Sequence, residues 1–360
     1  MTEREYLVVL YSYTYFGPAR TKLLISFFGS AKSVWGASKL KLTKTGIKTV
    51  VVDNFIQYRK NFDLANYFSR LKRGFYQFVT INDSNYPKNL KDLDDAPLVL
   101  YIKGKILPSD INAVSIVGSR KMTSYGREVT TRFASELASL GVTIVSGLAF
   151  GVDAMAHKVC LEHGGRTIAV LASGLDIITP KSNFFLAREI IRRGGAIVSE
   201  YPLGYPPLRT NFPNRNRVIS GLSKAVIVIE GAKKSGTLLT ASAAAEQGRP
   251  VFAVPGQITS PLSEAPNFLI QNGAKMATSS KDILEELNMQ LKVDLETLEN
   301  LMPSTPDEKK LLEILANEPL HLNEIARISS LKVSSVSANL SVMELKGMVK
   351  NVGNGIYKKI

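Results

Sequence analysis

The sequence predicts an α/β protein, in which a doubly wound parallel sheet follows a small all-α domain and precedes a C-terminal winged helix. Helical spacing of apolar residues dominates positions 1–80, and short β-branched runs alternate with amphipathic segments between residues 112 and 254. Three further amphipathic segments and a glycine-containing hairpin close the chain. Alternation of buried strands with helices is typical of a parallel sheet covered on both faces.

Residues 1–80 are predicted to form a domain of short helices. Gly17-Pro18-Ala19-Arg20 opens one of them, because a proline just inside a helix start needs no backbone N–H. The apolar residues that follow repeat at helical spacing: Leu23, Leu24, Phe27 and Phe28.

Residues 81–288 are predicted to form the sheet core, beginning with an extended lead-in that contains the apolar run Pro97–Ile102. Strands buried on both faces need continuous β-branched runs, which occur at Ala113–Val117, Val142–Val145, Thr167–Leu171, Ala196–Val198, Ala225–Ile229 and Val251–Val254. The helices expected between them are Arg127–Leu140, Asp153–Glu162, Phe184–Arg193 and Thr237–Gln247.

Residues 289–306, which include Pro303 and Pro306, are predicted to be a linker. Residues 307–360 then show the winged-helix outline, with helices near Glu308–Ala316, Leu322–Ile328 and Val333–Lys346 and a hairpin through Gly353–Gly355. The last helix is the candidate recognition helix. It is rich in serine, whereas duplex readers carry more Lys and Arg, so contact with duplex DNA and contact with protein both stay open.

The charge balance favours an anionic partner. The 360 residues carry 45 Lys+Arg against 31 Asp+Glu, a net charge of +14. Residues 1–80 alone hold 13 cations and 4 acids, a net charge of +9. One cysteine, Cys160, precludes an internal disulfide framework, and no apolar run reaches the ~20 residues of a membrane span, so we expect a cytoplasmic protein without a membrane partner.

The segment Arg209–Arg217 is the strongest functional signal in the chain. It reads Arg-Thr-Asn-Phe-Pro-Asn-Arg-Asn-Arg, with no carboxylate among its cations, and is expected to form a loop between two strands. Guanidiniums bind phosphates bidentately, amides read base edges, and an aromatic ring can stack on a base. This combination predicts a nucleic-acid ligand.

Three more loops are expected at the same edge of the sheet, where ligands bind in open α/β folds. Gly118-Ser119-Arg120 follows the first strand, and two glycines, Gly147 and Gly151, flank the next helix start. The loop after Ile229 offers cations and backbone N–H groups at a helix N-terminus, an arrangement that suits an anion, through Lys233, Lys234, Ser235, Gly236 and Thr237. Each loop alone could be an ordinary turn.

The sequence gives poor support to a nucleotide cofactor, to acid–base catalysis or to a metal site. The chain has no Gly-x-Gly-x-x-Gly dinucleotide motif and no Gly-x-x-x-x-Gly-Lys-Ser/Thr P-loop. Asp153 and His157 lie one helical turn apart, but we expect Asp153 to cap the helix and His157 to pack beside it. Histidines, cysteine and carboxylates nowhere show the spacing of a metal site.

The ordered motifs over residues 85–290 closely resemble the DprA/Smf family of DNA-processing proteins. They are Val117-Gly-Ser-Arg120, Ser146-Gly-Leu-Ala-x-Gly-x-Asp153, Gly174-Leu-Asp176, Ser199-Glu-Tyr-Pro202, Phe212-Pro-x-Arg-Asn-Arg-x-Ile-Ser-Gly221, Ser235-Gly-Thr-Leu-x-Thr-Ala241 and Phe252-Ala-Val-Pro-Gly256. The flanks match less well: the N-terminal part is similar to a sterile-alpha-motif or helix-hairpin-helix domain.

The resemblance implies an extended Rossmann-like core that dimerises, binds single-stranded DNA and loads a RecA-type recombinase, in natural transformation or related repair. It implies no chemical step and no cofactor. Gly118, Ser119, Arg120 and Gly147 then fall at phosphate-contacting positions, Arg209 and Phe212 hold the strand, and Asn214, Arg215 and Arg217 complete that wall.

Two alternative functions stay open. The core is also similar to nucleoside-monophosphate phosphoribohydrolases, whose Pro-Gly-Gly-x-Gly-Thr-x-x-Glu signature would end at Thr240 here, so that a threonine stands where a carboxylate is needed. The other alternative is a duplex-binding regulator that acts through the winged helix.

Overall fold

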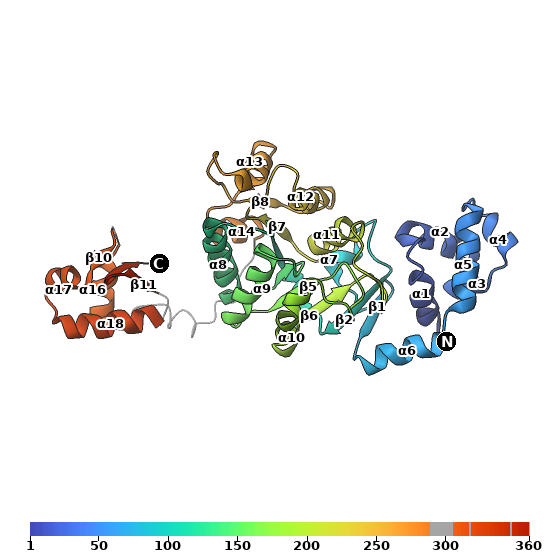
Figure 1. The fold of residues 1–360 in the computed structure, drawn as a ribbon, viewed down its shortest axis with the longest axis horizontal. Coiled ribbons are helices and arrows are strands. Elements are labelled where there is room, and N and C mark those ends of the chain that lie inside the picture. The colour runs from blue at the N-terminus through green and yellow to red at the C-terminus, as the bar shows by residue number, and fades with distance from the viewer. Residues whose placement is uncertain (289–304, 317, 346–347, 360) are drawn as a thin grey trace. The chain divides into compact units, whose positions relative to one another are not determined.

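The computed structural model describes residues 1–288, 305–316, 318–345 and 348–359 (Figure 1). The chain divides into two units, Met1–Gln290 and Leu291–Ile360. Within the described ranges, every helix is too short or too polar to cross a lipid bilayer, and no group of three or more His, Cys, Asp and Glu side chains is arranged to hold a metal ion.

The first unit begins with short helices, as predicted. They are α1 (Glu3–Tyr11), α2 (Gly17–Phe28), α3 (Ala31–Gly36), α4 (Lys39–Thr43), α5 (Thr49–Asn61) and α6 (Leu64–Arg73). Proline stands in the first turn of α2, and Gly29 ends this helix in the left-handed conformation, φ 83°. Leu24 is buried, but Leu23 and Phe27 are exposed.

These helices share one hydrophobic core with a face of the sheet. The core runs without a break from Leu10 and Phe55 to Tyr101 and Ile197. A buried hydrogen bond from the Tyr67 hydroxyl to the Tyr101 hydroxyl, 2.8 Å long, joins α6 to the sheet.

The sheet has nine strands in the order β1-β2-β6-β5-β4-β3-β7-β8-β9. Its strands are β1 (Gln77–Thr80), β2 (Val99–Gly104), β3 (Val114–Val117), β4 (Ile144–Ser146), β5 (Thr167–Val170), β6 (Ala196–Ser199), β7 (Ala225–Val228), β8 (Val251–Ala253) and β9 (Lys275–Met276). Strands β3 to β9 pair in parallel, in register such as Val117 beside Val228. The doubly wound parallel sheet is therefore confirmed.

Two features of the sheet differ from the prediction. The lead-in contains a true strand, β2, which pairs antiparallel with both β1 and β6. Strand β1 belongs to the sheet although it lies before residue 81, where the core was predicted to begin. The segment Gln77–Thr80 is short and shows no alternation of polar and apolar residues, and its pairing with Val99–Ile102 makes it a strand.

Helices cover both faces of the sheet in Figure 1: α7 (Lys88–Lys91), α8 (Ser124–Ser139), α9 (Val152–Glu162), α10 (Phe184–Arg192), α11 (Asn211–Gly221), α12 (Gly236–Glu246), α13 (Glu264–Gln271) and α14 (Ser280–Glu286). After β3 the chain adds β4, β5 and β6 on one side, and α11 then carries it back so that β7 pairs on the other side of β3. The β3–β7 junction is thus the topological switch point, where open α/β sheets bind ligands.

The second unit has the predicted winged-helix elements: α16 (Pro306–Ile314), β10 (Leu320–His321), α17 (Leu322–Ser329), α18 (Val333–Leu345), β11 (Val349–Gly353) and β12 (Ile356–Lys359). Its own core includes Leu311, Ile325 and Leu340. Pro306, placed in the predicted linker, instead opens α16 behind the N-cap Thr305. The rest of that linker up to residue 304 lies outside the described residues.

Candidate nucleic-acid interface

A cavity of about 430 Å³ opens at the switch point between β3 and β7. It brings together residues from the loop after β3, the first turns of α11 and the N-terminus of α12. Of the predicted site residues, those that line it are Gly118, Ser119, Arg120, Phe212, Arg215, Ser235, Gly236 and Thr237. We call this cavity the switch-point pocket.

The loop after β3 contributes backbone donors and an exposed cation. In the part of the chain that the structure describes, the N–H groups of Gly118, Ser119 and Arg120 donate to no protein acceptor. Gly118 has no room for a side chain, because an added Cβ would lie 2.7 Å from Val152. Free N–H groups beside the exposed Arg120 suit an anionic ligand.

The N-terminus of α12 supplies a second set of donors. Ser235 is its N-cap, but no side-chain hydrogen bond caps the helix. The buried Ser235 hydroxyl has no partner among the described residues. The N–H groups of Gly236 and Thr237 donate to no protein acceptor in this described loop, and the positive end of the helix dipole adds to them. Lys234 is exposed beside this turn but does not line the pocket.

The segment predicted as the loop Arg209–Arg217 is mostly helix, which corrects the prediction. Helix α11 begins at Asn211, with Thr210 as its N-cap. Pro213 is tolerated because the N–H groups of a first helical turn have no partner within the helix. Arg209 stays in the exposed loop before the helix and does not line the pocket.

Two guanidiniums of the pocket lie within about 6 Å of the Phe212 ring centre. The Arg120 guanidinium carbon is 5.3 Å from the centre of the Phe212 ring, and that of Arg215 is 5.9 Å away. Both distances are within the range of cation–π attraction. The half-buried ring and the exposed Arg120 therefore present an aromatic face and a cation together.

Arg215 is a buried cation, only 5% exposed, rather than a surface one. Its Nη1 donates to the carbonyl oxygens of Gly147 and Val170, at 2.5 and 3.0 Å, while its Nε has no partner among the described residues. Burial lowers the pKa of Arg215, which the Asp153 carboxylate opposes. Arg215 thus gives the pocket a positive floor.

Gly147 has a different role from the predicted phosphate contact. Its N–H donates to the Asp153 carboxylate at 3.1 Å, and an added Cβ would lie 1.6 Å from Arg215 Nη1. The glycine is therefore needed so that the buried guanidinium can approach the backbone. Because its donor is already used, Gly147 offers no free N–H to a ligand.

Asp153 and His157 bond to different partners rather than to each other. The prediction that Asp153 caps the helix is wrong. Its carboxylate accepts from Gly147 and Ala149 in the preceding loop, while Gly151 is the N-cap of α9. His157 Nδ1 lies 2.6 Å from the Thr167 hydroxyl. Burial lowers the pKa of His157 to about 3.

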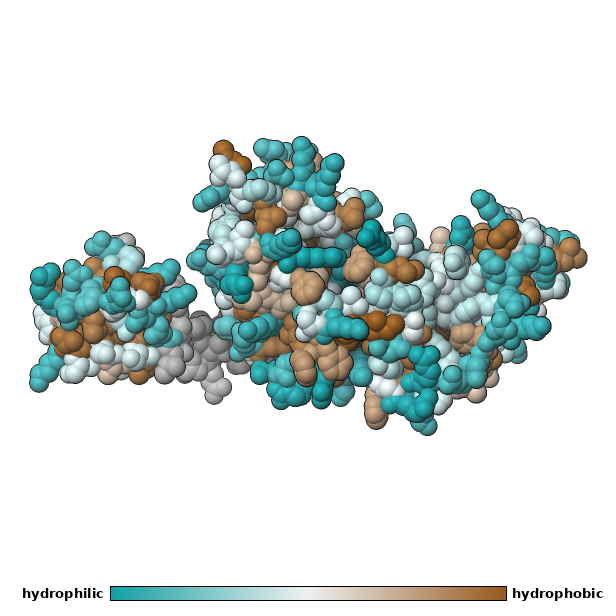
Figure 2. All heavy atoms as spheres, in the orientation of Figure 1, coloured by the Kyte–Doolittle hydropathy of each residue, from teal (hydrophilic) through white to brown (hydrophobic). Residues whose placement is uncertain are grey.

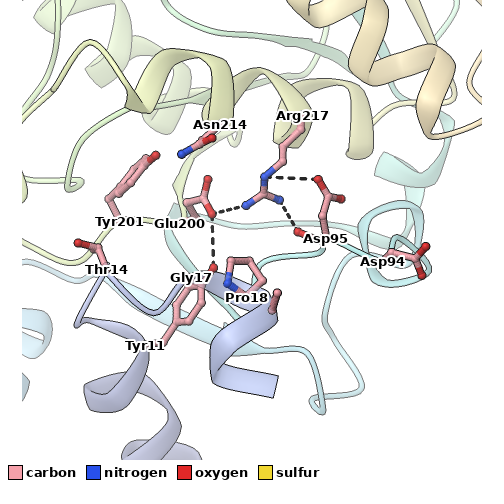
Figure 3. Close-up of a pocket in the computed structure, with 11 residues that line it drawn as sticks. Tyr11, Thr14, Gly17, Pro18, Asp94, Asp95, Glu200, Tyr201, Asn214 and Arg217 are labelled. Atoms are coloured by element: carbon pink, nitrogen blue, oxygen red, sulfur yellow. Dashed lines mark hydrogen bonds and ion pairs between the residues drawn. The ribbon is translucent and has the colours of Figure 1, made fainter. Parts of the chain in front are cut away.

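Arg217 and Asn214 line a separate cavity of about 320 Å³, between the N-terminal helices and α11. Figure 3 shows that it also receives Tyr11 and Glu200. Arg217 Nη2 donates to Glu200 at 2.5 Å, Nη1 donates to the Asp95 carbonyl at 2.5 Å, and Nε lies 3.5 Å from the Asp95 carboxylate. Arg217 is thus not an unpaired cation, which corrects the predicted wall.

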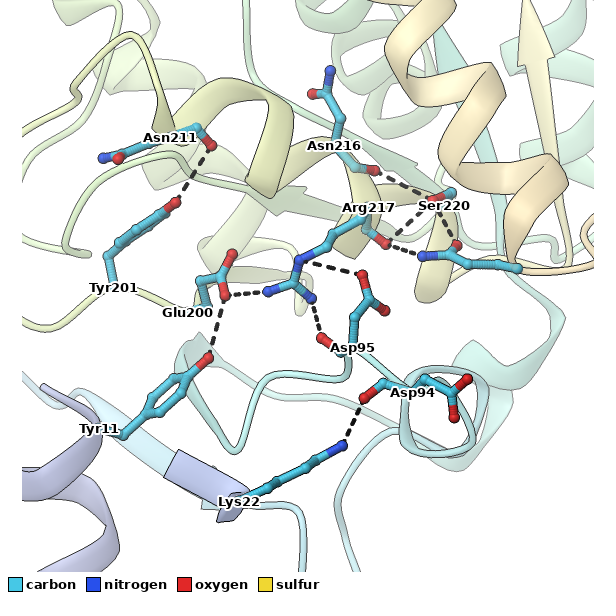
Figure 4. Close-up of polar contacts among 11 residues, drawn as sticks. Tyr11, Lys22, Asp94, Asp95, Glu200, Tyr201, Asn211, Asn216, Arg217 and Ser220 are labelled. Carbon is cyan, nitrogen blue, oxygen red and sulfur yellow. Dashed lines mark hydrogen bonds and ion pairs between the residues drawn. The ribbon is translucent and has the colours of Figure 1, made fainter. Parts of the chain in front are cut away.

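The polar network around Arg217 ties the helical region to the core (Figure 4). The Tyr11 hydroxyl donates to the same Glu200 oxygen at 3.4 Å. Burial raises the pKa of Glu200, and the positive charge of Arg217 opposes that rise. Burial alone would lower the pKa of Arg217, but Glu200 and the other surrounding acidic groups raise it, so the guanidinium stays charged.

Sequence reasoning missed the role of Glu200 and several exposed aromatic residues of the core. Glu200 was read only as part of a family motif, and nothing local marks it as the partner of Arg217. Exposed aromatic rings occur at Phe150 in the loop before α9 and at Phe184 and Phe185 in α10. Figure 2 shows apolar side chains among hydrophilic ones on the core, where α10 lies.

The fold is that of an α/β protein with a winged helix domain, and the donors and cations of the switch-point pocket suit an anionic ligand. Comparison with known families agrees with this. Residues 77–288 match the family model described as DNA recombination-mediator protein A, and residues 297–355 match the DprA winged helix domain.

Individual relatives cover most of the chain. Protein Smf of Escherichia coli is 38% identical over 88% of this chain and 86% of its own length. DNA processing protein DprA of Bacillus subtilis is 39% identical over 70% of this chain and 88% of its own. This chain therefore belongs to the DprA/Smf family, and family membership gives it a role in DNA processing.

Two solved structures are similar as well. The crystal structure of DNA processing protein A from Streptococcus pneumoniae has 33% identity and a TM-score of 0.61, covering 79% of this chain and 93% of that one. A structure of the Helicobacter pylori protein that concerns its single-stranded DNA binding mode has 32% identity and a TM-score of 0.53, covering 59% of this chain and 95% of that one.

Proposed function

We propose that this protein binds single-stranded DNA at the switch-point pocket, protects the strand and passes it to a RecA-type recombinase, in natural transformation or related DNA processing. The observation that carries the proposal is the close approach of Phe212 to both Arg120 and Arg215, beside free N–H groups from two loops. Phosphates suit these donors, and a base can stack on a ring. The single-stranded DNA binding of the H. pylori relative supports the same reading.

The activity needs no chemical step on the strand. Thr240 is buried where the related hydrolases place their carboxylate. The pocket does contain one carboxylate, Asp153, but this side chain holds the loop after β4 through two N–H groups. Hydrolysis of a glycosidic bond usually uses two carboxylates, so the pocket favours binding over catalysis.

The proposal predicts which side chains matter for DNA affinity. Arg120→Ala, Arg209→Ala and Phe212→Ala should each weaken binding of labelled oligo-dT, the last by roughly 1–3 kcal/mol if the ring stacks a base. Arg132→Ala, which removes an exposed cation of α8, and Phe27→Ala, which removes an exposed ring of α2, are matched controls. Fluorescence anisotropy measures each affinity. Unchanged affinity in all three variants would contradict the proposal.

We extend the proposal to a homodimer that delivers the strand to the recombinase. Mass from light scattering tests the dimer, and the rate of recombinase filament growth on pre-bound DNA tests delivery. The duplex-binding alternative has little support, since helix α18 contains no Lys or Arg between Val333 and Leu345. Preference for duplex over single strand, lost on removal of residues 289–360, would favour that alternative instead.

A further inference from the structure

The cavity between the N-terminal helices and α11 has a buried polar floor and an exposed rim. Glu200, Tyr11 and Tyr201 line its floor and are all buried. Ala19, Asp94 and Asn214 also line it and are exposed. Lys22 Nζ donates to the Asp94 carbonyl oxygen at 2.7 Å and so holds the rim loop against α2. We call this cavity the Glu200 pocket.

One carboxylate oxygen in this pocket lacks a partner. Glu200 is only 8% exposed, and its Oε2 accepts from both Arg217 and Tyr11. Its Oε1 is buried without a hydrogen-bond partner among the described residues. Figure 3 shows this second oxygen pointing away from Arg217, toward Asn214 and Tyr201. A buried acceptor without a donor is costly, and a ligand N–H would relieve that cost.

The charged residues that line the Glu200 pocket favour a ligand with a hydrogen-bond donor and disfavour a phosphate. Asp94, Asp95 and Glu200 contribute three carboxylates against the single guanidinium of Arg217. All three nitrogens of that guanidinium already contact Glu200 or Asp95. A phosphate would therefore meet carboxylates without a free cation, whereas an amino group would meet the unpartnered Glu200 oxygen.

Helix α11 places this pocket next to the switch-point pocket. Phe212 and Arg215 line the switch-point pocket, while Asn214 and Arg217 line the Glu200 pocket. The two cavities thus lie on either side of the first turns of one helix, whose residues rise about 1.5 Å each. The Glu200 pocket is therefore the neighbouring cavity for a strand held at Arg120.

We propose that the Glu200 pocket binds an amino-bearing nucleobase of the bound single strand, with Glu200 Oε1 accepting from the exocyclic amino group. This inference rests on the proposed function. A carboxylate is a known acceptor for the cytosine N4 amino group. Uracil presents a carbonyl oxygen at the same place, which Glu200 repels, so the pocket gives the protein a preference for cytosine over uracil.

Oligo-dC and oligo-dU of equal length test this inference, because the bases differ in the group that faces Glu200. At neutral pH the wild-type protein should bind oligo-dC about fivefold or more tightly than oligo-dU, as a hydrogen bond to a charged group would give. Glu200→Gln removes the negative charge that repels the uracil carbonyl and adds an amide donor, so it should reduce this ratio toward one.

A cavity-filling variant tests the pocket without altering the Glu200–Arg217 pair. Ala19→Phe places a ring at the rim of the pocket and should also abolish the preference for oligo-dC. Ala65→Phe, at an exposed alanine of α6 outside the pocket, is the matched control and should keep it. Equal wild-type affinities for the two oligonucleotides, or a preference that survives both Ala19→Phe and Glu200→Gln, would overturn the inference. Binding of oligo-dU that still depends on Arg120 would leave the proposed function intact.

Discussion

Replacing Arg217 by alanine should destabilise the protein rather than remove a DNA contact. The Arg217 and Glu200 side chains are 14% and 8% exposed, and their closest atoms lie 2.5 Å apart. Loss of the guanidinium leaves a buried carboxylate with only the Tyr11 hydroxyl as a donor. Removal of one partner of a buried ion pair costs about 3–5 kcal/mol, so a loss of that size is expected in the free energy of unfolding.

Urea unfolding followed by fluorescence of the single tryptophan measures this loss. The ring centres of Trp35 and Phe55 lie 5.8 Å apart in the N-terminal helical region. The Tyr11 hydroxyl links this region to Glu200. Arg192→Ala, which breaks an exposed ion pair with Glu189, should leave the urea midpoint nearly unchanged. The double variant Glu200→Gln with Arg217→Met should recover much of the loss, because both charges are then absent. An Arg217→Ala protein of wild-type stability but weak DNA binding would refute the structural role.

Three further outcomes are expected. Gly147→Ala should lower stability by about 1–3 kcal/mol in urea unfolding, because the new Cβ collides with the Arg215 guanidinium; wild-type stability would contradict this packing. The unfolded chain binds a proton at His157 below pH 6.5, but the folded chain binds it only near pH 3. The contribution of His157 to the free energy of unfolding is therefore fully present above pH 6.5. It falls by about 1.4 kcal/mol per pH unit below that pH. His157→Gln should flatten that dependence, measured as urea midpoints from pH 7 to 5, and an unchanged slope would argue against a neutral buried imidazole. A protein ending at residue 288 should keep wild-type affinity for oligo-dT, and a large loss would assign DNA contacts to the winged helix.

The fold could be predicted from the sequence because its signals are local. Continuous β-branched runs such as Ala225–Val228 mark buried strands, and helical spacing marks the elements between them. The convergence of loops at the switch point followed from the rule for parallel sheets. Helix α11 was missed because the polar residues and Pro213 at its start are equally typical of a loop.

The partners of the arginines could not be predicted in the same way. Arg217 pairs with Glu200 and with Asp95, which lies 122 positions away in the chain. Arg215 is buried against carbonyls of two other strand ends. The charge content of one segment does not reveal such distant partners. The sequence therefore predicted a DNA contact for Arg209, Arg215 and Arg217 alike. The structure leaves Arg209 and Arg120 as exposed cations and makes Arg215 and Arg217 internal.

The salt dependence of oligo-dT affinity tests the central claim most directly. Each phosphate contact to a single strand contributes roughly 0.7 to the slope of log affinity against log salt concentration. Arg120→Ala should reduce the magnitude of that slope by about this amount, whereas Arg132→Ala, at an exposed cation of α8, should not. Identical slopes for the wild-type and Arg120→Ala proteins would contradict a phosphate contact at the switch-point pocket.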